Sequence, residues 1–521
     1  MTQIDPRARE AWAGRSVRSR LKVVRRFRGL LADKADWVAK DVAEATASRP
    51  EGSVGVAEVL TSEVLPLCDA AKFLQREAGY WLKPQRLGWR GRPAWLFGVA
   101  SEIRREPLGT VLIIAAGNYP LFLPGVQALQ ALVAGNAVVL KPGRGGTAAA
   151  AWLADVLRDA GLPAGLLVVE EESVEAAERW LGGCVPAEAG TPIRRANKVF
   201  LTGSVESGRA VLAKCAETLT PACVELSGCD AVFVLPGSDE ATVALAAKAV
   251  AFGLRLNGSQ TCIAPRRVFV ATGRIESDFA CALRDEVNWF GPVPVDPGVM
   301  ARVHAMFNAW WSEADASPND KSQHRERLTG RWKPVGALEA VPFVLWGVKP
   351  TDEIAQADLF APVVSIIRCS GDTEMLQADA ACPYALGASV FGPRKEAERF
   401  ARRVRAGSVT VNDLVAPTAD PRLPFGGRGD SGFGVTRGAE GLLEMTRVKT
   451  VSVRRLNQHP HYDPVGDEDA AAFAAYLRTV HGPSWASRLA SLPALFGGLK
   501  ALSKKSGSNQ GNQDDREQHE S

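Results

Sequence analysis

A cysteine in a tight turn is the residue around which the chemistry of this chain can be argued. Cys262 comes after an apolar, helix-like run that ends at the polar turn Asn257–Ser259, and a β-like run begins after Pro265. A thiolate is a strong nucleophile, and backbone amides outside regular structure can hold the oxyanion that forms when it attacks a carbonyl carbon. The turn therefore predicts attack on a carbonyl group, although a cysteine considered alone more often only packs in a core.

Further polar residues stand where predicted strands end. They are Asn118, Lys141 to Arg144, Gly203 with Ser204, and Glu225. Because ligands of doubly wound sheets bind at the carboxyl ends of the strands, these residues are expected to surround one site together with the cysteine turn. Considered singly, Asn118 would be a turn residue before Pro120, and Glu225 a carboxylate at a strand edge.

The composition is that of an ordinary globular protein without a nucleic-acid partner. Of its 521 residues 62 are basic and 58 acidic, so the chain has no strong positive field for a polyanion. Its nine cysteines never show the CxxC spacing of zinc sites, and no metal is expected. Their odd number and scattered positions indicate reduced thiols and a cytoplasmic location. With no apolar N-terminal signal and no apolar run of about 18 residues, no membrane span is expected.

Strand-like and helix-like segments alternate from Gly109 onward. Apolar runs at 111–116, 137–143, 198–204 and 223–228 are expected to be strands of a first sheet, with helices between them. A second series opens at 231–239 and continues through PFVLWGV, PVVSIIRC, GASVFG and SVTVND. The alternation predicts an α/β fold with two Rossmann-like parallel-sheet domains. Helical patterns at 6–47 and 54–82 precede the strands.

With these motifs in place, the chain resembles the aldehyde dehydrogenase superfamily, specifically its shorter branch that oxidises fatty and aromatic aldehydes. The resemblance covers roughly residues 10 to 455 and rests on motifs that occur in the family's order. They are EPLGTVLIIAAGNYPL, VVLKPG, FLTGS, VELSG, NGSQTCIAP, LFAPVVSI and FGGRGDSGFG. No single motif is specific, but seven in order around one cysteine are.

The resemblance implies a division of the chain into two main domains and several smaller parts. Residues 1–97 and 111–227 would form the dinucleotide-binding domain, and residues 228–447 the catalytic domain. Residues 98–110 and 448–456 would form a small β oligomerisation arm, followed by a C-terminal extension at 457–505 and a disordered tail at 506–521. The expected assembly is a homodimer or a homotetramer.

The resemblance also implies a role for each catalytic residue. Cys262 would attack the aldehyde to give a thiohemiacetal, while the side-chain amide of Asn118 and the Cys262 backbone N–H stabilise the oxyanion. Transfer of a hydride to the cofactor would leave a thioester. Glu225 would then act as general base for the water that hydrolyses this thioester.

The implied cofactor is NAD or NADP. Lys141 would bond the adenosine ribose, and Gly203 with Ser204 would meet the pyrophosphate at a helix N-terminus. Asp358 and Phe360 stand where the family has a glutamate and a phenylalanine that hold the nicotinamide ribose. Arg144 takes the place of a glutamate that many NAD-preferring members have, and its guanidinium suits a 2′-phosphate.

Other positions also depart from the family pattern. Ser259 stands where the cysteine motif has glycine, and Gly117 replaces the aromatic residue that usually precedes Asn118. Asp358 is a shorter carboxylate than the family glutamate, and Ala361 replaces a glycine. These changes concern the geometry of the turn, the lining of the substrate pocket and the grip on the cofactor.

The expected function is NAD(P)-dependent oxidation of an aldehyde to a carboxylate. One alternative is an acylating or reducing enzyme that exchanges the thioester with coenzyme A, and another is a non-catalytic scaffold of the same fold. Retention of Glu225 favours hydrolysis, and its retention together with Cys262 and Asn118 argues against a scaffold.

The segment 484–505 has a pattern of its own. It places Trp485, Leu489, Phe496 and Leu499 at near-helical spacing, with lysines close by. This predicts an amphipathic helix that contacts a membrane surface or a partner, with docking on its own subunit as the alternative.

Overall fold

The computed structural model describes most of the chain. It covers residues 3–47, 54–182, 195–289, 293–315, 326–329, 339–340, 342–456, 459–462 and 464–500. The predicted disordered tail at 506–521 lies outside these residues. The described chain belongs to two compact units, Met1–Gln85 with Ile103–Lys449 and Arg86–Glu102 with Thr450–Ser521.

Helices form the N-terminal part, as the helical patterns predicted. They are α1 (Pro6–Ala13), α2 (Val17–Asp33), α3 (Ala35–Ala47), α4 (Val56–Val59), the π-helical turn η1 (Leu60–Val64) and α5 (Leu65–Trp81). The side chains of Asp5 and Ser16 cap the first two helices by accepting backbone N–H groups. Trp12, Phe27 and Leu31 are fully buried against the first sheet's helices, so this region contributes to the core and is more than a surface layer.

The first sheet has the strand order β19-β7-β6-β3-β4-β5. The strands are β3 (Thr110–Ile114), β4 (Ala137–Lys141), β5 (Leu167–Val169), β6 (Lys198–Gly203), β7 (Ala222–Leu226) and β19 (Gly432–Phe433). All neighbours pair in parallel except β19, which is antiparallel to β7. Alternate residues of β3 enter opposite cores, because helices α6 (Phe122–Ala134) and α7 (Thr147–Asp159) pack on one face, and α8 (Val174–Leu181) and α9 (Val205–Thr218) on the other.

The second sheet has the order β11-β13-β14-β9-β8-β16-β17. Its strands are β8 (Asp230–Val234), β9 (Pro265–Ala271), β11 (Glu326–Thr329), β13 (Phe343–Trp346), β14 (Val363–Cys369), β16 (Gly387–Phe391) and β17 (Ser408–Val411). Helices α10 (Glu240–Arg255) and α11 (Arg274–Trp289) contribute to the core on one face. The other face is covered by α12 (Pro297–Asp315), α13 (Glu353–Gln356), α14 (Asp372–Ala380) and α15 (Arg394–Ala401). Only β11 is antiparallel to its neighbour.

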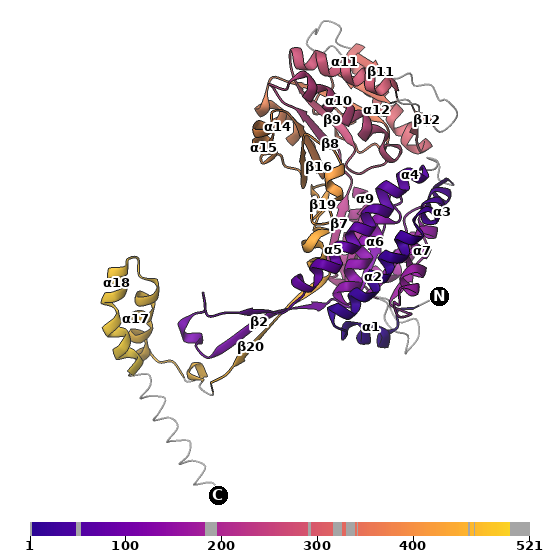
Figure 1. Cartoon of the computed structure of the whole chain (residues 1–521). Coiled ribbons are helices and arrows are strands. Elements are labelled where there is room, and N and C mark those ends of the chain that lie inside the picture. Colours follow the sequence, from indigo (N-terminus) through magenta and orange to yellow (C-terminus); the bar gives the residue numbers. More distant parts are fainter. Residues whose placement is uncertain are drawn as a thin grey trace. The chain divides into compact units, whose positions relative to one another are not determined.

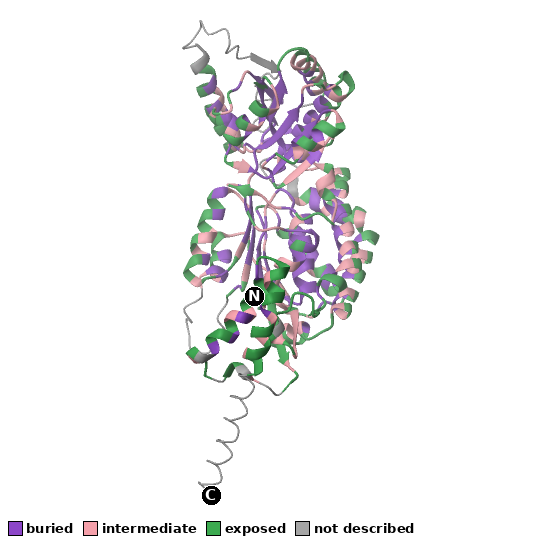
Figure 2. Ribbon diagram, turned by 90° about the vertical axis from the view of Figure 1, so that its left-hand side faces the viewer, coloured by how far each residue is buried: buried purple, intermediate pink, exposed green. Residues whose placement is uncertain are grey.

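The predicted α/β class with two parallel-sheet domains is therefore confirmed (Figure 1). Figure 2 shows that buried residues concentrate along the strands and exposed residues along the outer faces of the helices. Short elements complete the two sheets' surroundings: β10 (Val293–Pro294), β12 (Glu339–Ala340), β15 (Tyr384–Ala385), β18 (Arg428–Gly429), the 3-10 turns η3 (Leu256–Ser259) and η5 (Ala416–Ala419), and α16 (Gly438–Glu444).

The chain returns to the first sheet after completing the second. β19 pairs with β7 so that Gly432 lies opposite Glu225, and α16 contacts α5 and α6. A side chain at Gly432 would place its Cβ 2.0 Å from the Val224 carbonyl oxygen, so this close pairing requires glycine. The domain limits expected from the sequence remain a prediction. Two elements of the expected catalytic domain at 228–447, β19 and α16, pack with the first sheet and its helices.

The remaining elements form an antiparallel arm and a C-terminal helical pair. The arm is a sheet of order β1-β2-β20, made of β1 (Gln85–Leu87), β2 (Val99–Pro107) and β20 (Thr446–Arg454), with the turn η2 (Ala94–Leu96). Beyond it come η6 (Pro460–Tyr462), η7 (Asp467–Asp469), α17 (Ala470–His481) and α18 (Trp485–Ala490), and residues 492–500 are again helical. No helix in the described part of the chain combines the length and apolarity needed to cross a bilayer.

Candidate active site

The turn that carries Cys262 has an unusual backbone. After α10 ends at Arg255, Asn257, Gly258 and Ser259 all have positive φ angles, of 49°, 60° and 63°. Such angles are uncommon for residues with a side chain and persist where the surroundings enforce them. Here the Asn257 backbone N–H donates to Glu58 Oε1 of α4 at 2.5 Å, and its side-chain Nδ2 donates to the Asn118 carbonyl at 3.0 Å.

A buried arginine fixes the other end of the turn. Arg266 donates from Nη1 to Ser259 Oγ at 2.8 Å and from Nη2 to the Ser259 carbonyl at 2.6 Å. The same Nη1 also donates to the Ala361 carbonyl at 2.6 Å. Ser259, which departs from the family glycine, therefore keeps a left-handed conformation and uses its hydroxyl as a hydrogen-bond acceptor.

Cys262 and Glu225, predicted as partners, are in contact. The half-buried Cys262 Sγ donates to Glu225 Oε1 at 3.6 Å. Glu225 lies on β7 and is only 3% exposed, and within the described part of the chain its Oε2 has no hydrogen-bond partner. Burial raises the pKa of Glu225, with the Arg437 guanidinium opposing the rise. Burial also raises the pKa of the Cys262 thiol, and the carboxylates of Glu225 and Asp230 act in the same direction.

Asn118 lies beside the cysteine turn, as predicted. Its Nδ2 donates to the Gln260 carbonyl at 2.7 Å, which fixes the amide and leaves its second N–H for another acceptor. The preceding Gly117 is explained by a close approach, because a Cβ there would lie 2.7 Å from the Arg144 carbonyl oxygen. The aromatic residue of the family pattern has no room at this position.

A cavity of about 310 Å³ opens onto Cys262 and Glu225. Its walls are mostly apolar and aromatic. They include Tyr119, Phe122, Leu123, Phe252, Leu256, Ile263, Val415 and Phe425. The cavity also contains a cation, Arg437, that the sequence analysis missed. Its only sequence signal is its position three residues after the glycine-rich run 424–434, and nothing in that spacing distinguishes it from a surface arginine.

Lys141 lies at the carboxyl end of β4, where the sequence placed it. It is half-buried, which lowers the pKa of its ammonium group, and Glu172 opposes that change. Glu172 is a second residue that sequence reasoning missed. It accepts hydrogen bonds from the backbone N–H of Gly145 and of Thr147, at 2.9 and 3.1 Å, at the start of α7. A carboxylate therefore stands near Lys141 although Arg144 has replaced the family glutamate.

Arg144 itself is exposed and forms an ion pair with Asp296 at 3.2 Å. Gly203 is the last residue of β6 and Ser204 follows it, and Ser204 Oγ caps α9 by accepting the Ser207 N–H at 3.2 Å. In the sheet, Gly203 pairs with Leu226, the residue after Glu225. The predicted pyrophosphate turn thus adjoins the predicted base.

Asp358 and Phe360 lie between α13 and β14, near the arginine that holds the cysteine turn. The Oδ1 atom of Asp358 is buried without a hydrogen-bond partner, and burial raises the pKa of this carboxyl group against the pull of Arg266. Phe360 has a φ of 39°, so the backbone here is also strained. Asn118, Lys141, Gly203 and Glu225 thus lie at the carboxyl ends of strands of the first sheet, as predicted. Cys262, Asp358 and Phe360 instead precede β9 and β14, so the expectation that the cysteine turn follows a strand is wrong, and this part of the site lies at the amino ends of the second sheet's strands.

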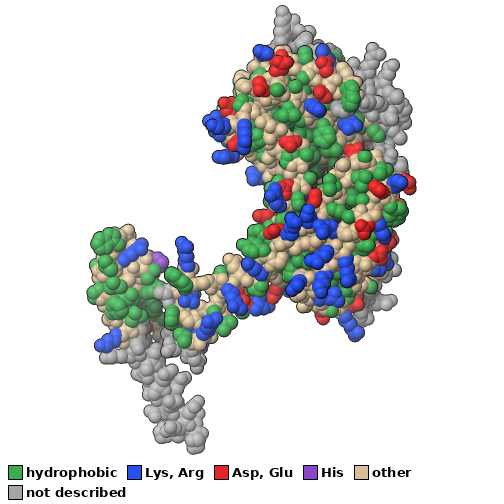
Figure 3. All heavy atoms as spheres, viewed as in Figure 1, with side chains coloured by type: hydrophobic (Ala, Val, Ile, Leu, Met, Phe, Trp, Pro, Cys, Tyr) green, Lys and Arg blue, Asp and Glu red, His purple; other side chains and the backbone are tan. Residues whose placement is uncertain are grey.

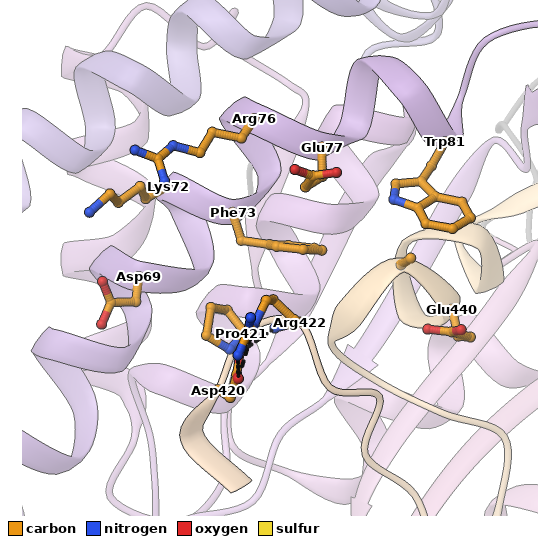
Figure 4. Close-up of a pocket in the computed structure, with 11 residues that line it drawn as sticks. Asp69, Lys72, Phe73, Arg76, Glu77, Trp81, Asp420, Pro421, Arg422 and Glu440 are labelled. Atoms are coloured by element: carbon orange, nitrogen blue, oxygen red, sulfur yellow. Dashed lines mark hydrogen bonds and ion pairs between the residues drawn. The ribbon is translucent and has the colours of Figure 1, made fainter. Parts of the chain in front are cut away.

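A larger hollow, of about 590 Å³, lies between α5 and the segment 420–422 (Figure 4). Its lining carries charges of both signs, among them Lys72, Arg76 and Glu77, and Asp420 pairs with Arg422 at 2.5 Å. It contains none of the predicted site residues, so its size does not make it the candidate site.

Comparison with known proteins shows the family of this chain. The model of the family described as "Aldehyde dehydrogenase family" matches residues 4–451. The chain belongs to the aldehyde dehydrogenase family. It is 29% identical to an aldehyde dehydrogenase of Craterostigma plantagineum over 78% of this chain and 82% of the relative. It is 28% identical to a 4,4'-diapolycopene aldehyde oxidase of a Methylomonas species, over 91% and 86%.

A solved Mycobacterium tuberculosis aldehyde dehydrogenase complexed with NAD+ is similar in structure as well. The TM-score is 0.70 at 25% identity, covering 84% of this chain and 86% of that one. The cofactor of the present protein, as a member of this family, is NAD or NADP. The residues present fit such a group, since Lys141 and the N-terminus of α9 offer donors for ribose and phosphate oxygens and Asp358 Oδ1 is a buried acceptor without a partner.

Substitutions at Ser259 test how the cysteine turn is held. Ser259→Gly accepts the positive φ and keeps the backbone carbonyl bond with Arg266 but loses the hydroxyl bond. We therefore expect a loss of about 0.5–1.5 kcal/mol in the free energy of unfolding, and aldehyde oxidation within about tenfold of the native rate. Ser259→Val puts a β-branched residue at a φ it strongly disfavours, and about 2 kcal/mol or more should be lost together with most activity. Denaturant unfolding and kcat/KM measure both, and equal behaviour of the two variants would contradict this account.

Proposed function

We propose that this protein oxidises an aldehyde to a carboxylate with NAD or NADP, through a covalent intermediate on Cys262. The observation that carries the proposal is the contact of Cys262 Sγ with Glu225 Oε1 at 3.6 Å inside a mostly apolar cavity. A thiol paired with a buried carboxylate can lose its proton to that carboxylate, which passes it on to solvent and is ionised again, and the resulting thiolate is the nucleophile.

The three predicted catalytic residues divide the work. Cys262 attacks the carbonyl carbon, and Asn118 donates its second amide N–H to the oxygen that becomes negative. When bound, the dinucleotide supplies the hydride acceptor. Glu225 then removes a proton from the water that attacks the thioester, and its Oε2, which has no partner among the described residues, is the atom suited to hold that water.

Release by water is favoured over transfer to coenzyme A because Glu225 faces the thiol. The direct test is NAD(P)H formation with a panel of aliphatic and aromatic aldehydes, with and without coenzyme A. We expect turnover without coenzyme A. A strict requirement for coenzyme A would favour the acylating alternative, and no reaction with any aldehyde would favour a scaffold.

The cavity supports an apolar aldehyde as substrate. Phe122, Phe252, Leu256 and Ile263 line the space next to the thiol and offer few hydrogen-bonding groups.

The arm is proposed to join two copies of the chain, in a homodimer or homotetramer. The sheet β1-β2-β20 is small, and Leu87 at the end of β1 is exposed together with Trp89, Trp95 and Phe97 in the connection between β1 and β2. Large apolar side chains exposed within so short a segment indicate a surface that another chain covers.

The C-terminal helical pair is proposed to bind an anionic lipid surface. Phe473, Leu477, Trp485, Leu489 and Phe496 are exposed there, and Figure 3 shows hydrophobic side chains gathered on α17 and α18. The sequence from 470 to 500 contains no Asp or Glu, whereas Arg478, Arg488 and Lys500 are basic. Apolar and cationic groups without anionic ones match a membrane surface that carries negative charge.

Glu225→Gln is expected to stall the reaction after acylation. The amide cannot take a proton from water, so turnover should fall by about 10²–10⁴ and the acyl group should remain on Cys262. Mass spectrometry of the variant with aldehyde and cofactor detects the adduct, and Cys262→Ala should show neither adduct nor turnover. Free enzyme at native turnover would contradict the role of Glu225.

Arg144 and Glu172 give opposite predictions for the choice of dinucleotide. An exposed ion pair such as Arg144–Asp296 is weak, so the guanidinium can turn to a 2′-phosphate, and NADP should be no more than about tenfold (about 1.4 kcal/mol) worse than NAD. Arg144→Glu should shift the ratio of kcat/KM values toward NAD. Glu172→Gln, which keeps an acceptor at α7 but removes a charge near Lys141, should shift it toward NADP. An unchanged ratio in Arg144→Glu would remove this residue from ribose recognition.

Lipid binding by the full chain tests the C-terminal proposal. We expect co-sedimentation with vesicles containing phosphatidylserine, less with phosphatidylcholine alone, and a fivefold or greater loss in the double variant Trp485→Ser, Phe496→Ser. Trp289→Ser, which changes an exposed tryptophan of α11, is the matched control. Unchanged binding by the double variant, or a change only in oligomeric mass, would overturn the lipid assignment.

A further inference from the structure

Arg437 is a buried cation in the cavity that opens onto Cys262 and Glu225. The reaction proposed above gives this arginine no role. It is 6% exposed and lines the cavity together with Cys262 and Glu225. Among the described residues that line this cavity, it is the only lysine or arginine. A guanidinium in an apolar cavity is costly to desolvate, so its presence calls for an explanation.

The backbone and neighbours of Arg437 hold this charge in one place. Its φ and ψ angles of 61° and 176° fall in a region that is almost restricted to glycine, which points to strain at a functional position. Nη1 donates to the Thr418 carbonyl at 2.7 Å. The guanidinium carbon lies 4.2 Å from the ring centroid of Phe425 and 5.8 Å from that of Phe122. The Nε atom, although buried, has no hydrogen-bond partner.

The charged groups around Arg437 are mostly acidic. Glu225 on β7 and the thiol of Cys262 interact with it electrostatically. Asp230 on β8 and Asp358 also act on the thiol and disfavour its ionisation, and burial raises the pKa of Asp230 itself to about 8.

Other groups near the site do not supply the missing positive charge. Of the other buried arginines near the site, Arg266 is committed to Ser259 and Ala361, and Arg267 to the Cys229 carbonyl and Asp379. Tyr119, which also lines the cavity, shares a hydrogen bond with Thr261, and burial keeps its pKa above the usual range. Arg437 is thus the cation placed to offset the negative charge that Glu225 and a Cys262 thiolate carry together.

We propose that Arg437 is a positioning residue for the reaction, whose fixed charge keeps Glu225 ionised in the apolar cavity and favours the thiolate of Cys262. The proposal rests on the function proposed above, in which these two residues act as base and nucleophile. On this proposal, the strained backbone and the burial of Arg437 serve to hold its positive charge near Glu225 and Cys262. Arg437 itself does not contact the substrate.

The test is the pH dependence of Cys262 alkylation, followed without aldehyde or cofactor. Iodoacetamide reacts with thiolates, so the rate of modification, located on Cys262 by mass spectrometry, reports the ionisation of this thiol. In Arg437→Gln the inflection should move up by at least about one pH unit, with at least a tenfold slower reaction near pH 7. Arg437→Lys, which keeps a positive charge, should recover most of the native profile. Arg422→Gln, at an exposed arginine in the neighbouring hollow, should leave the profile unchanged.

Three results would overturn the proposal. The first is an unmoved inflection in a folded Arg437→Gln. The second is a rate lowered equally at every pH, which indicates only a structural role. The third is a defect confined to the oxidation of aldehydes that carry a carboxylate, which makes Arg437 a substrate-binding group. Arg437→Met keeps apolar contacts with Phe122 and Phe425 and replaces the Gln variant if that variant does not fold. Alkylation of Cys262 needs no turnover, so this assay tests the role of Arg437 apart from the proposed function. Failure of the proposed function would be seen in a different result, namely aldehyde oxidation by the Cys262→Ala variant.

Discussion

The site depends on a turn that would not keep its shape alone. Asn257 and Ser259 hold left-handed backbone angles because Glu58, Asn118 and Arg266 bond the turn from three other segments. These bonds lie at the ends of elements that the sheets have already placed, so the turn is set by the fold around it. Its shape in turn decides where the Cys262 sulfur and its backbone N–H point.

Burial at this turn gives the site its electrostatic character. Glu225 is almost fully enclosed, and in such surroundings a carboxylate and a thiolate both become harder to form. Because water is largely excluded there, Glu225 as base and Cys262 as nucleophile need a positive charge nearby to favour their ionised forms. Arg437 is positioned in the same cavity, and its strained backbone shows that the fold maintains it there against local preference.

In the predicted cofactor region, a carboxylate missing from one position is supplied by a residue from another segment of the chain. Arg144 replaces an acidic residue of the family pattern, yet the carboxylate of Glu172 reaches the same loop from the segment after β5. Gly117 and Gly143 allow the loops after β3 and β4 to touch, since a Cβ at either would meet backbone atoms of the other loop. The charge near Lys141 therefore depends on which loops lie beside it in the folded chain. The sequence motif that contains Lys141 and Arg144 does not determine this charge alone.

The sequence by itself determined the fold class and most of the site. Apolar runs with turn residues after them located the parallel strands, and the rule that ligands bind at strand ends selected Asn118, Lys141, Gly203 and Glu225, of which Asn118 and Glu225 contact the cysteine turn. Only the tertiary structure decided the rest. β19 has two residues, too few for any periodicity, and Glu58, Glu172 and Arg437 act on partners that lie far from them in the chain. Such contacts leave no local pattern, because they depend on which elements pack together.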